Sequence, residues 1–226
     1  MLRDALLDAI ALLFPVHCAG CGCDDRGLCA ACRLALTPDV TARLGPDRLR
    51  VHTALRYEGV VRRVILAYKE QARTDAATAL SAPLAAAVAT ARRATPAAVL
   101  VPVPGSRAAF RRRGYDPVRL LLRRAGLRHE PLLAQARGTG IQKSLGVEER
   151  AANLRGAFVA RRHLTGLEVV LVDDVLTSGA TLGEAARAVR AAGGEVVAAA
   201  TLAFTPRLLP FRDKTSGDDY GGAKGA

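Results

Sequence analysis

The stretch Val169–Thr181, V-V-L-V-D-D-V-L-T-S-G-A-T, decides the fold of this chain. Its first four residues are apolar and three of them are β-branched, which predicts a short buried strand. Two carboxylates, Asp173 and Asp174, stand at the end of that strand, and a turn rich in hydroxyl groups follows. A helix is then predicted over Leu182–Ala192, ended by two glycines. The stretch therefore predicts a strand–turn–helix unit of an α/β protein.

The turn has the composition of a phosphate site. In open parallel sheets, ligands bind beyond the carboxyl ends of the strands, where a following helix presents its positive dipole end. Gly179 permits positive φ and a close approach of a ligand to the backbone, and Thr177, Ser178 and Thr181 add hydroxyl donors. Two carboxylates would repel a phosphate unless they face hydrogen-bond donors. Vicinal sugar hydroxyls, with a divalent cation nearby, meet that need.

Three other interpretations compete for this stretch. A Walker B strand also ends in an acidic pair, but the chain has no G-x-x-x-x-G-K-[ST] motif upstream. A receiver domain carries its acidic pair after the first strand, whereas this pair stands near the end of the chain. A plain strand–turn–helix rarely gathers two acids and three hydroxyls on one turn. We therefore favour a sugar-phosphate site.

Composition sets broader limits. The 226 residues are half apolar, which is enough for one full domain and a small appendage. The net charge of +12 favours acidic partners such as phosphates or nucleic acid, but an Ala- and Arg-rich, Lys-poor chain is also what a GC-rich genome encodes. Aromatic residues make up only 4%, which argues against a base-stacking platform.

Targeting and membrane signals are absent from the sequence. Met1–Phe14 carries a helical apolar stripe, predicted to be a docking helix, with a membrane-surface helix as the minor alternative. Two aspartates interrupt that stripe and no cleavage site follows it, so a secretory signal is not expected. No run is long enough to span a bilayer, and we expect a cytoplasmic protein.

Cys18, Cys21, Cys29 and Cys32 form two C-x₂-C pairs seven residues apart. Such pairs suit tetrahedral thiolate coordination, which predicts a structural zinc site closed by four protein ligands; an iron–sulfur or redox site is the alternative. Cys23 fits neither pair and is interpreted as a bystander.

A second anion site is predicted after the apolar strand Ala97–Val103. That strand runs into Pro104-Gly105-Ser106 and then into Arg107 and Arg113, although an exposed basic helix would have the same composition. Lys69, at the end of a helix predicted over Val60–Lys69, could reach a phosphate or lie in solvent. Arg137–Gly146 is polar and glycine-rich, which predicts a mobile loop.

The rest of the chain supplies ordinary elements. Thr37–Pro46 has the Pro and Gly content of a linker, and Ser81–Ala94 is predicted as a helix with Ser81 as N-cap and Pro83 in its first turn. A helix capped by Asp116, with Pro117 in its first turn, is also expected. Further strands are predicted over Arg50–Tyr57 and Glu195–Phe204, and disorder over Lys214–Ala226.

The stretch around Asp173 resembles the phosphoribosyl-pyrophosphate (PRPP) signature of type I phosphoribosyltransferases. More narrowly, the cysteine pairs, Tyr57-x-Gly59, P-V-P, Arg113-Gly114-Tyr115, Thr139-x-x-Gln142, Arg150-x-x-Asn153 and D-D-V-x-T-x-G resemble, in order, the ComF family of competence-associated proteins. The chain departs from that family at Asp116 and Pro117, where Asn-Gln is usual. The resemblance covers about residues 1–204.

The resemblance implies a type I phosphoribosyltransferase fold, a parallel sheet flanked by helices, with a zinc-ribbon-like module at the N-terminus. The implied division is residues 1–45 for the N-terminal helix and module, 46–205 for the phosphoribosyltransferase-like domain and 206–226 for a disordered tail. It implies that Asp173 and Asp174 meet the ribose hydroxyls of PRPP, with Mg²⁺ as its companion ion. The remaining implied PRPP contacts are Thr177, Ser178, Gly179, Ala180 and Thr181 for the 5′-phosphate, Gly105, Ser106 and Arg113 for the pyrophosphate, and Gln142 and Lys143 in the mobile loop.

Three functions follow as hypotheses. The first is an enzyme that transfers a phosphoribosyl group and releases pyrophosphate, with a role in DNA uptake during natural transformation. The second is a PRPP- or nucleotide-binding protein without catalysis that engages single-stranded DNA. The third is a structural adaptor, which the intact signature argues against.

Overall fold

A five-stranded sheet forms the centre of the protein. The computed structural model describes residues 17–24, 27–136 and 155–206, with the strands of the sheet in the order β1-β2-β7-β6-β3. Strands β2, β7, β6 and β3 run parallel, and β1 pairs antiparallel with β2 at one edge. The strand bounds are Thr41–Leu44 for β1, Arg50–Arg56 for β2, Val99–Pro102 for β3, Glu168–Leu176 for β6 and Glu195–Phe204 for β7. This mostly parallel sheet confirms the predicted α/β class.

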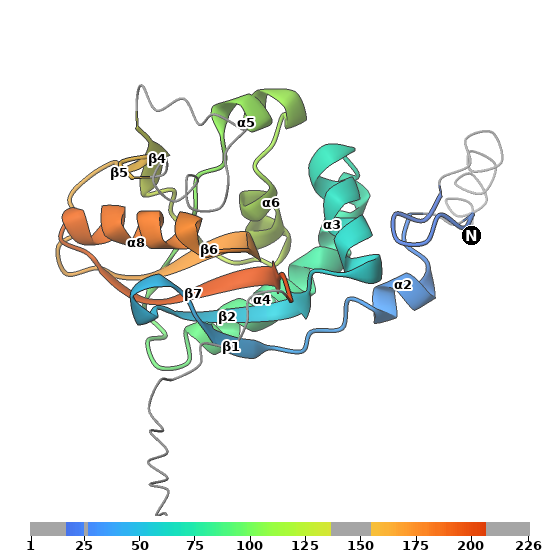
Figure 1. The fold of residues 1–226 in the computed structure, drawn as a ribbon, viewed down its shortest axis with the longest axis horizontal. Coiled ribbons are helices and arrows are strands. Elements are labelled where there is room, and N and C mark those ends of the chain that lie inside the picture. Colours follow the sequence, from blue (N-terminus) through green and yellow to red (C-terminus); the bar gives the residue numbers. More distant parts are fainter. Residues whose placement is uncertain (1–16, 25–26, 137–154, 207–226) are drawn as a thin grey trace, which may run out of the picture.

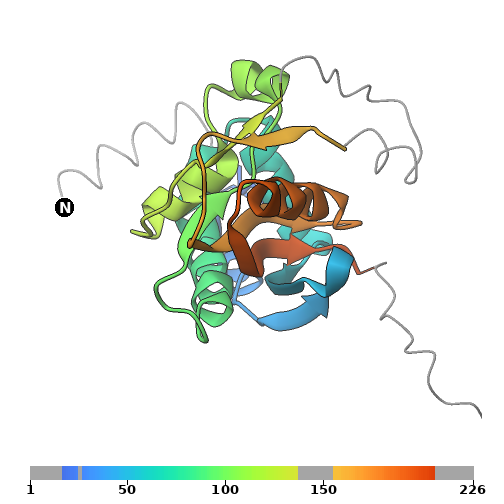
Figure 2. The same ribbon diagram turned by 90° about the vertical axis from the view of Figure 1, so that its left-hand side faces the viewer.

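Helices cover both faces of the sheet. Helix α8 lies along one face, and α4 lies on the other with α3 and α6 packed beside it (Figures 1 and 2). A separate two-stranded antiparallel sheet joins β4 and β5. The remaining bounds are α2 Ala30–Leu34, η1 Pro46–Arg48, α3 Gly59–Glu70, η2 Thr74–Ala76, α4 Ala77–Ala91, α5 Arg107–Arg113, α6 Pro117–Arg124, β4 Leu133–Gln135, β5 Phe158–Ala160 and α8 Ala180–Ala191.

Each face of the sheet has its own apolar core. Leu80 and Leu84 of α4 pack with Val170 and Val172 of β6 on one side. Leu182 of α8 packs with Val169 and Leu171 of the same strand on the other side. Because successive side chains of a strand point to opposite faces, the continuous apolar run of β6 is buried on both sides, as parallel strands of α/β proteins are.

Two predicted segments differ from the structure. Helix α4 begins at Ala77, so Ser81 is not its N-cap and Pro83 lies inside the helix. The hydroxyl of Ser81 donates to the Thr78 carbonyl instead, at 2.9 Å, because Ala77 and Leu80 are drawn into the core and extend the helix towards its N-terminus. The expected linker Thr37–Pro46 contains the edge strand β1, which pairs with β2 from Thr41↔Thr53 to Leu44↔Arg50.

The register of the sheet brings the predicted sites together. Pro102 at the end of β3 aligns with Val172 of β6, and Asp173 aligns with Thr201 of β7. The loop after β3 and the turn after β6 therefore both start at the carboxyl ends of neighbouring parallel strands. These two strands are about 4.8 Å apart. Within the described ranges, every helix is too short or too polar to cross a bilayer.

Pro46, in the connection between β1 and β2, packs against the turn after β6. Gly179 has φ of +77°, in the left-handed region that favours glycine. A Cβ at Gly179 would lie 2.7 Å from Pro46 Cδ, and one at Gly183 would lie 3.1 Å from Pro46 Cβ. Pro46 thus packs directly on the start of α8 and leaves room only for glycine there.

We expect Gly179→Ala to lower the free energy of unfolding by about 2–4 kcal/mol, because it adds a clash with Pro46 to the cost of a left-handed alanine. Gly166→Ala is the matched control. Its φ is +76° and a Cβ there meets nothing within 4 Å, so only the conformational cost of about 1–2 kcal/mol remains. Urea unfolding measures both values. An equal loss of stability in the two variants would show that the Pro46 contact is unimportant. If the contact matters, adding Pro46→Ala should restore part of the stability lost in Gly179→Ala.

Candidate functional site

The acidic pair lies at the carboxyl end of β6, and its two members have different neighbours. Asp174 forms an ion pair with Lys69 of α3, with 2.6 Å between Lys69 Nζ and Asp174 Oδ2. Only 23% of the Lys69 side chain and 21% of the Asp174 side chain are exposed. Burial alone would lower the pKa of Lys69, but the charge of Asp174 and its hydrogen bond outweigh burial, so the pKa is raised. Lys69 therefore stays charged and neutralises Asp174.

Asp173 forms no ion pair with any residue in the described ranges. Its Oδ1 accepts the backbone N–H of Asp174 at 2.8 Å. Burial, and then the neighbouring charge of Asp174, raise the pKa of Asp173 to about 8. Its aligned neighbour Thr201 is fully buried, and so is Thr53, which aligns with Thr201 on β2. The acid thus ends a row of buried polar side chains across the sheet, and its other oxygen can donate or accept a hydrogen bond.

The predicted phosphate turn is open to solvent. Thr177 and Ser178 are exposed, Thr181 is half-buried and Gly179 is buried against Pro46. The N–H of Gly183 bonds to the Gly179 carbonyl at 2.9 Å and is the first to be satisfied inside α8. The N–H of Ala180 meets only the Ser178 hydroxyl, at 3.4 Å. Amides at the start of this 12-residue helix thus face the turn, as an anion site requires.

The predicted pyrophosphate loop begins beside β6. The N–H of Val103 donates to the Val172 carbonyl at 2.9 Å, which ties the start of the loop to the neighbouring strand. Gly105 is exposed, and the hydroxyl of Ser106 accepts the N–H of Ala109 at 3.1 Å as the N-cap of α5. The serine hydroxyl keeps its own proton for a further acceptor.

Arg113, the third predicted pyrophosphate contact, is bound to a protein carboxylate. Its guanidinium lies 2.6 Å from Glu70 Oε1, and Arg112 pairs with the other oxygen of the same carboxylate. Burial would raise the pKa of Glu70, but the hydrogen bond and charge of Arg113 outweigh it and lower the pKa. Arg113 therefore helps to anchor α5 on α3, and its charge is already balanced.

Three consecutive residues in the last turn of α3, Tyr68, Lys69 and Glu70, connect the acidic pair with α5 and α6. Of these three, the sequence indicated a functional role only for Lys69. Tyr68 donates its hydroxyl proton to the Pro117 carbonyl at 2.8 Å, Lys69 holds Asp174, and Glu70 holds the arginines of α5. The sequence singled out Lys69 as a possible phosphate contact. Nothing local distinguishes Glu70, because its partners stand more than 40 residues away.

The four predicted zinc ligands come together. The Sγ atoms of Cys18, Cys21, Cys29 and Cys32 all lie within 4.8 Å of one another. Backbone N–H groups of Gly20 and Cys29 donate to Cys18 Sγ at 3.4 Å. Burial would raise the pKa of Cys18, but the backbone hydrogen bonds outweigh it and lower the pKa to about 6. Four clustered sulfurs with amide donors match a tetrahedral structural Zn²⁺ site.

Arginines fasten this cysteine module to the main body. Arg73 donates to the carbonyls of His17 at 3.0 Å and Gly27 at 3.2 Å, and it also pairs with Asp75. Arg63 of α3 donates to the Gly20 carbonyl. The module is therefore docked beside α3.

Two predicted ligand contacts, Gln142 and Lys143, lie outside the described residues, as do the helix predicted over Met1–Phe14 and the tail from residue 207 onwards. The structure therefore leaves these predictions as they stand.

We expect the purified protein to carry one zinc ion per chain and Cys29→Ser to lose it, because three thiolates and a hydroxyl do not form a closed thiolate site. Cys23→Ser is the control. Cys23 is exposed and lies outside the four-sulfur cluster, although its Sγ is 3.2 Å from Cys21 Sγ. Elemental analysis of dialysed protein measures the metal. Loss of zinc in Cys23→Ser would contradict the assigned ligand set.

A pH-dependent change in stability is expected from Asp173. The folded protein keeps its proton up to a pH of about 8, whereas an unfolded chain releases it near pH 4. Folding therefore takes up a proton between these values, and the free energy of unfolding contributed by Asp173 falls as pH rises through this window. Asp173→Asn should have a higher Tm than wild type at pH 8, with the difference shrinking towards pH 5. Thermal melts from pH 5 to pH 8 test this, and a pH-independent difference would refute it.

Comparisons with known proteins agree with this geometry. The family described as phosphoribosyl transferase domain matches residues 133–219, which include the acidic pair and the turn after it. Competence protein F of Haemophilus influenzae is 30% identical over 106 residues, 43% of this chain and 46% of that protein. An orotate phosphoribosyltransferase of Sphingopyxis alaskensis is 54% identical over 50 residues, 21% of this chain and 26% of that protein.

The matched segments span less than half the length of either relative. The family match nevertheless agrees with the mostly parallel sheet that carries the acidic pair. The chain therefore carries a segment of phosphoribosyltransferase type and is similar to a competence protein F.

Proposed function

We propose that this protein binds PRPP together with Mg²⁺ and transfers its phosphoribosyl group to a nitrogen acceptor with release of pyrophosphate. The observation that carries the proposal is the acidic pair placed directly before an amide-lined turn, on a strand adjacent to the Gly105–Ser106 loop. A sugar carrying phosphate groups at two positions matches this arrangement. Its hydroxyls need acceptors and its two phosphate ends need donors.

The proposed roles follow from the contacts in the site. Asp173, which forms no ion pair in the described part of the chain, accepts a hydrogen bond from one ribose hydroxyl. Asp174 accepts from the other hydroxyl while its second oxygen stays with Lys69. Thr177 through Thr181 hold the 5′-phosphate at the start of α8. Gly105 and Ser106 receive the pyrophosphate, and Arg113 supports that loop through Glu70.

The oxygen donors of this edge suit a hard cation such as Mg²⁺, which prefers carboxylates and substrate phosphates over nitrogen ligands. Asp174 would supply a carboxylate oxygen, Asp173 would do so on losing its proton, and PRPP would supply the rest. When bound, Mg²⁺ neutralises charge on the pyrophosphate and so makes it a better leaving group.

The reaction breaks the bond between C1′ and the pyrophosphate oxygen, with the electron pair leaving on pyrophosphate. The lone pair of the acceptor nitrogen forms the new bond at C1′, and the nitrogen then loses a proton. Positive charge develops at C1′ in between, and the nearby carboxylates stabilise it. By holding both ends of PRPP, the two loops supply the orientation on which such a transfer depends. We further propose that Gln142 and Lys143 contact PRPP.

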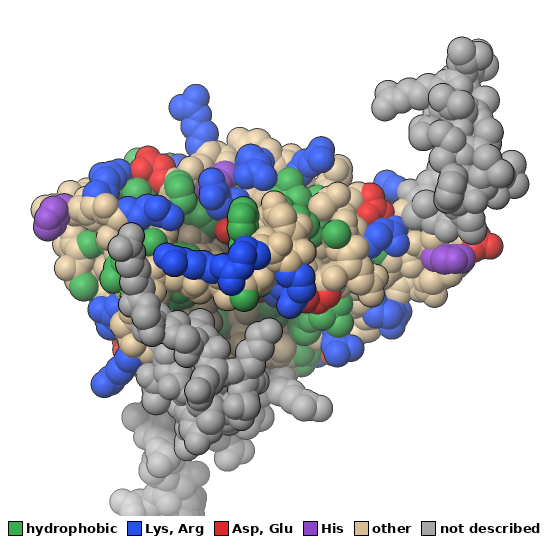
Figure 3. Space-filling view, turned by 90° about the horizontal axis from the view of Figure 1, so that it is seen from above, with side chains coloured by type: hydrophobic (Ala, Val, Ile, Leu, Met, Phe, Trp, Pro, Cys, Tyr) green, Lys and Arg blue, Asp and Glu red, His purple; other side chains and the backbone are tan. Residues whose placement is uncertain are grey.

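A second candidate function is binding of single-stranded DNA during competence, with the phosphate site used only for binding. The net charge of +12 and the many separate Lys and Arg side chains on the face in Figure 3 favour it. The similarity to a competence protein of Haemophilus influenzae is consistent with a role in DNA uptake. We place either function in the cytoplasm, where the cysteine module keeps its thiolates.

Calorimetry of PRPP with Mg²⁺ tests the proposal. We expect binding by the wild type and at least a tenfold loss of affinity in Asp174→Asn, since a charge-assisted hydrogen bond is worth about 1.5–3 kcal/mol. Glu168→Gln, at the exposed opposite end of the same strand, is the matched control and should bind like wild type.

The absence of heat with the wild type would remove the PRPP proposal. In that case, binding of a labelled single-stranded oligonucleotide that weakens as salt rises would favour the second function.

A further inference from the structure

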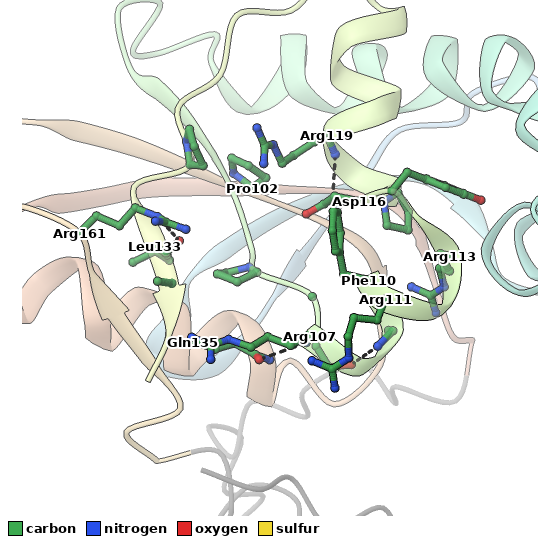
Figure 4. Close-up of a pocket in the computed structure, with 18 residues that line it drawn as sticks. Pro102, Arg107, Phe110, Arg111, Arg113, Asp116, Arg119, Leu133, Gln135 and Arg161 are labelled. Atoms are coloured by element: carbon green, nitrogen blue, oxygen red, sulfur yellow. Dashed lines mark hydrogen bonds between the residues drawn. The ribbon is translucent and has the colours of Figure 1, made fainter. Parts of the chain in front are cut away.

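A cavity of about 360 Å³ lies on the outer side of the pyrophosphate loop, between α5, α6 and the β4–β5 pair. Its lining includes Pro102 at the end of β3, Phe110 of α5, Arg119 of α6, Leu133 of β4 and Arg161 next to β5 (Figure 4). It shares Gly105 and Ser106 with the proposed pyrophosphate site. None of its lining residues comes from β6 or from the turn after it. The cavity is therefore a space beside the ribose site, not part of it.

The walls of this cavity are strongly basic. Five arginines line it against one acid, Asp116, whose Oδ1 accepts the N–H of Arg119 at 3.0 Å as the cap of α6. The five are Arg107, Arg111, Arg113, Arg119 and Arg161. Arg113 is balanced by Glu70, but among the described residues no acid pairs with Arg107, Arg111 or Arg119. An anion that entered the cavity would thus meet unbalanced positive charge from two helices, α5 and α6.

Two of these arginines carry buried donors that need an acceptor. The Nε atoms of Arg113 and Arg119 are shielded from solvent and have no hydrogen-bond partner within the described part of the chain. A buried unsatisfied donor costs about 1–3 kcal/mol, so these two guanidinium groups are incompletely satisfied by the described part of the protein. Guanidinium groups bind phosphate oxygens with well-directed paired hydrogen bonds.

Much of the remaining lining is apolar, although Ser106 and Gln135 also contribute. Pro102, Pro104, Pro117 and Pro131 contribute ring surfaces, and Phe110 projects from α5 with 54% of its surface exposed. Phe110 is thus a large aromatic side chain that the core does not use. Aromatic and guanidinium planes together form a stacking surface for a planar base. The volume is at the lower end of the range of about 300–1,000 Å³ for small-molecule pockets, which fits a single nucleotide and not a polymer.

We propose that this cavity is a binding site for a nucleoside monophosphate, with the base against Phe110 and the prolines and the phosphate on Arg119 and Arg107. The site does not depend on the proposed PRPP function. Because it borders the Gly105–Ser106 loop from the side away from β6, its ligand would lie next to the pyrophosphate position without touching the acidic pair.

Calorimetric titration of the full chain with adenosine 5′-monophosphate (AMP) tests this site. We expect about one AMP per chain, with adenosine and inorganic phosphate each binding at least tenfold more weakly. Arg119→Gln and Phe110→Ala should each weaken AMP binding at least tenfold while keeping the wild-type Tm. Arg119→Gln leaves the α6 cap intact, since that cap uses the backbone N–H. Arg124→Gln, exposed on the same helix and outside the cavity, is the matched control and should bind AMP normally.

The two sites are separated by crossing the variants with the ligands. Asp174→Asn should keep AMP binding, and Arg119→Gln should keep PRPP binding. No AMP heat with wild type, or loss of AMP binding in Asp174→Asn, would overturn the proposal. In the latter case AMP would be occupying the ribose site. Full displacement of AMP by inorganic pyrophosphate would overturn the proposal, because it would show that AMP occupies the pyrophosphate position. Tighter, Arg119-dependent binding of a ten-residue oligodeoxyadenylate would also overturn it, because it would show that the cavity binds DNA and not a mononucleotide.

Discussion

The ion pair between Lys69 and Asp174 is the interaction on which the arrangement of the site depends. It joins the last turn of α3 to the carboxyl end of β6, two segments more than 100 residues apart, with 2.6 Å between Nζ and Oδ2. Removing one partner of a fully buried pair costs about 3–5 kcal/mol, because the other charge is left uncompensated; here about a fifth of each side chain remains exposed, so the cost is lower. The pair contributes little net stability, but it fixes where α3 ends.

The position of that helix end has further effects. Glu70 follows Lys69 and binds the arginines of α5, while Tyr68 precedes it and bonds to the first residue of α6. The same turn therefore sets the acidic pair, the pyrophosphate loop and one wall of the arginine-lined cavity. Loss of the ion pair between Lys69 and Asp174 would reach all three, because one helical turn carries the three contacts. Pro46 has the corresponding role on the opposite face, where it limits the space behind Gly179.

The sequence correctly predicted the helices and strands whose formation depends on interactions between residues close together in the chain. The apolar run of β6, the Asp116 cap with Pro117 at the start of α6 and the span of β7 all follow from propensity and capping chemistry, and the structure has them. Edge strand β1 escaped prediction because four residues flanked by Pro and Gly form a strand only when β2 is there to pair with them. Pro83 inside α4 escaped prediction because burial of Ala77 and Leu80 extends the helix beyond the apparent cap. The partners of Lys69, Glu70 and Gly179 are all distant in sequence, and a single sequence carries no sign of such pairs.

The contacts between the cysteine module and α3 have a consequence for the acidic pair, Asp173 and Asp174. Arg63 of α3 and Arg73, just beyond its end, both donate hydrogen bonds to backbone carbonyls of the module that holds the four clustered sulfurs. Helix α3 thus contacts the cysteine module through Arg63 in its second turn, and Arg73 contacts the module just after the turn that carries Lys69. On the proposals above, loss of zinc from the module would loosen these contacts and so shift Lys69 relative to Asp174. Binding of a sugar phosphate at the acidic pair would then depend on zinc supply.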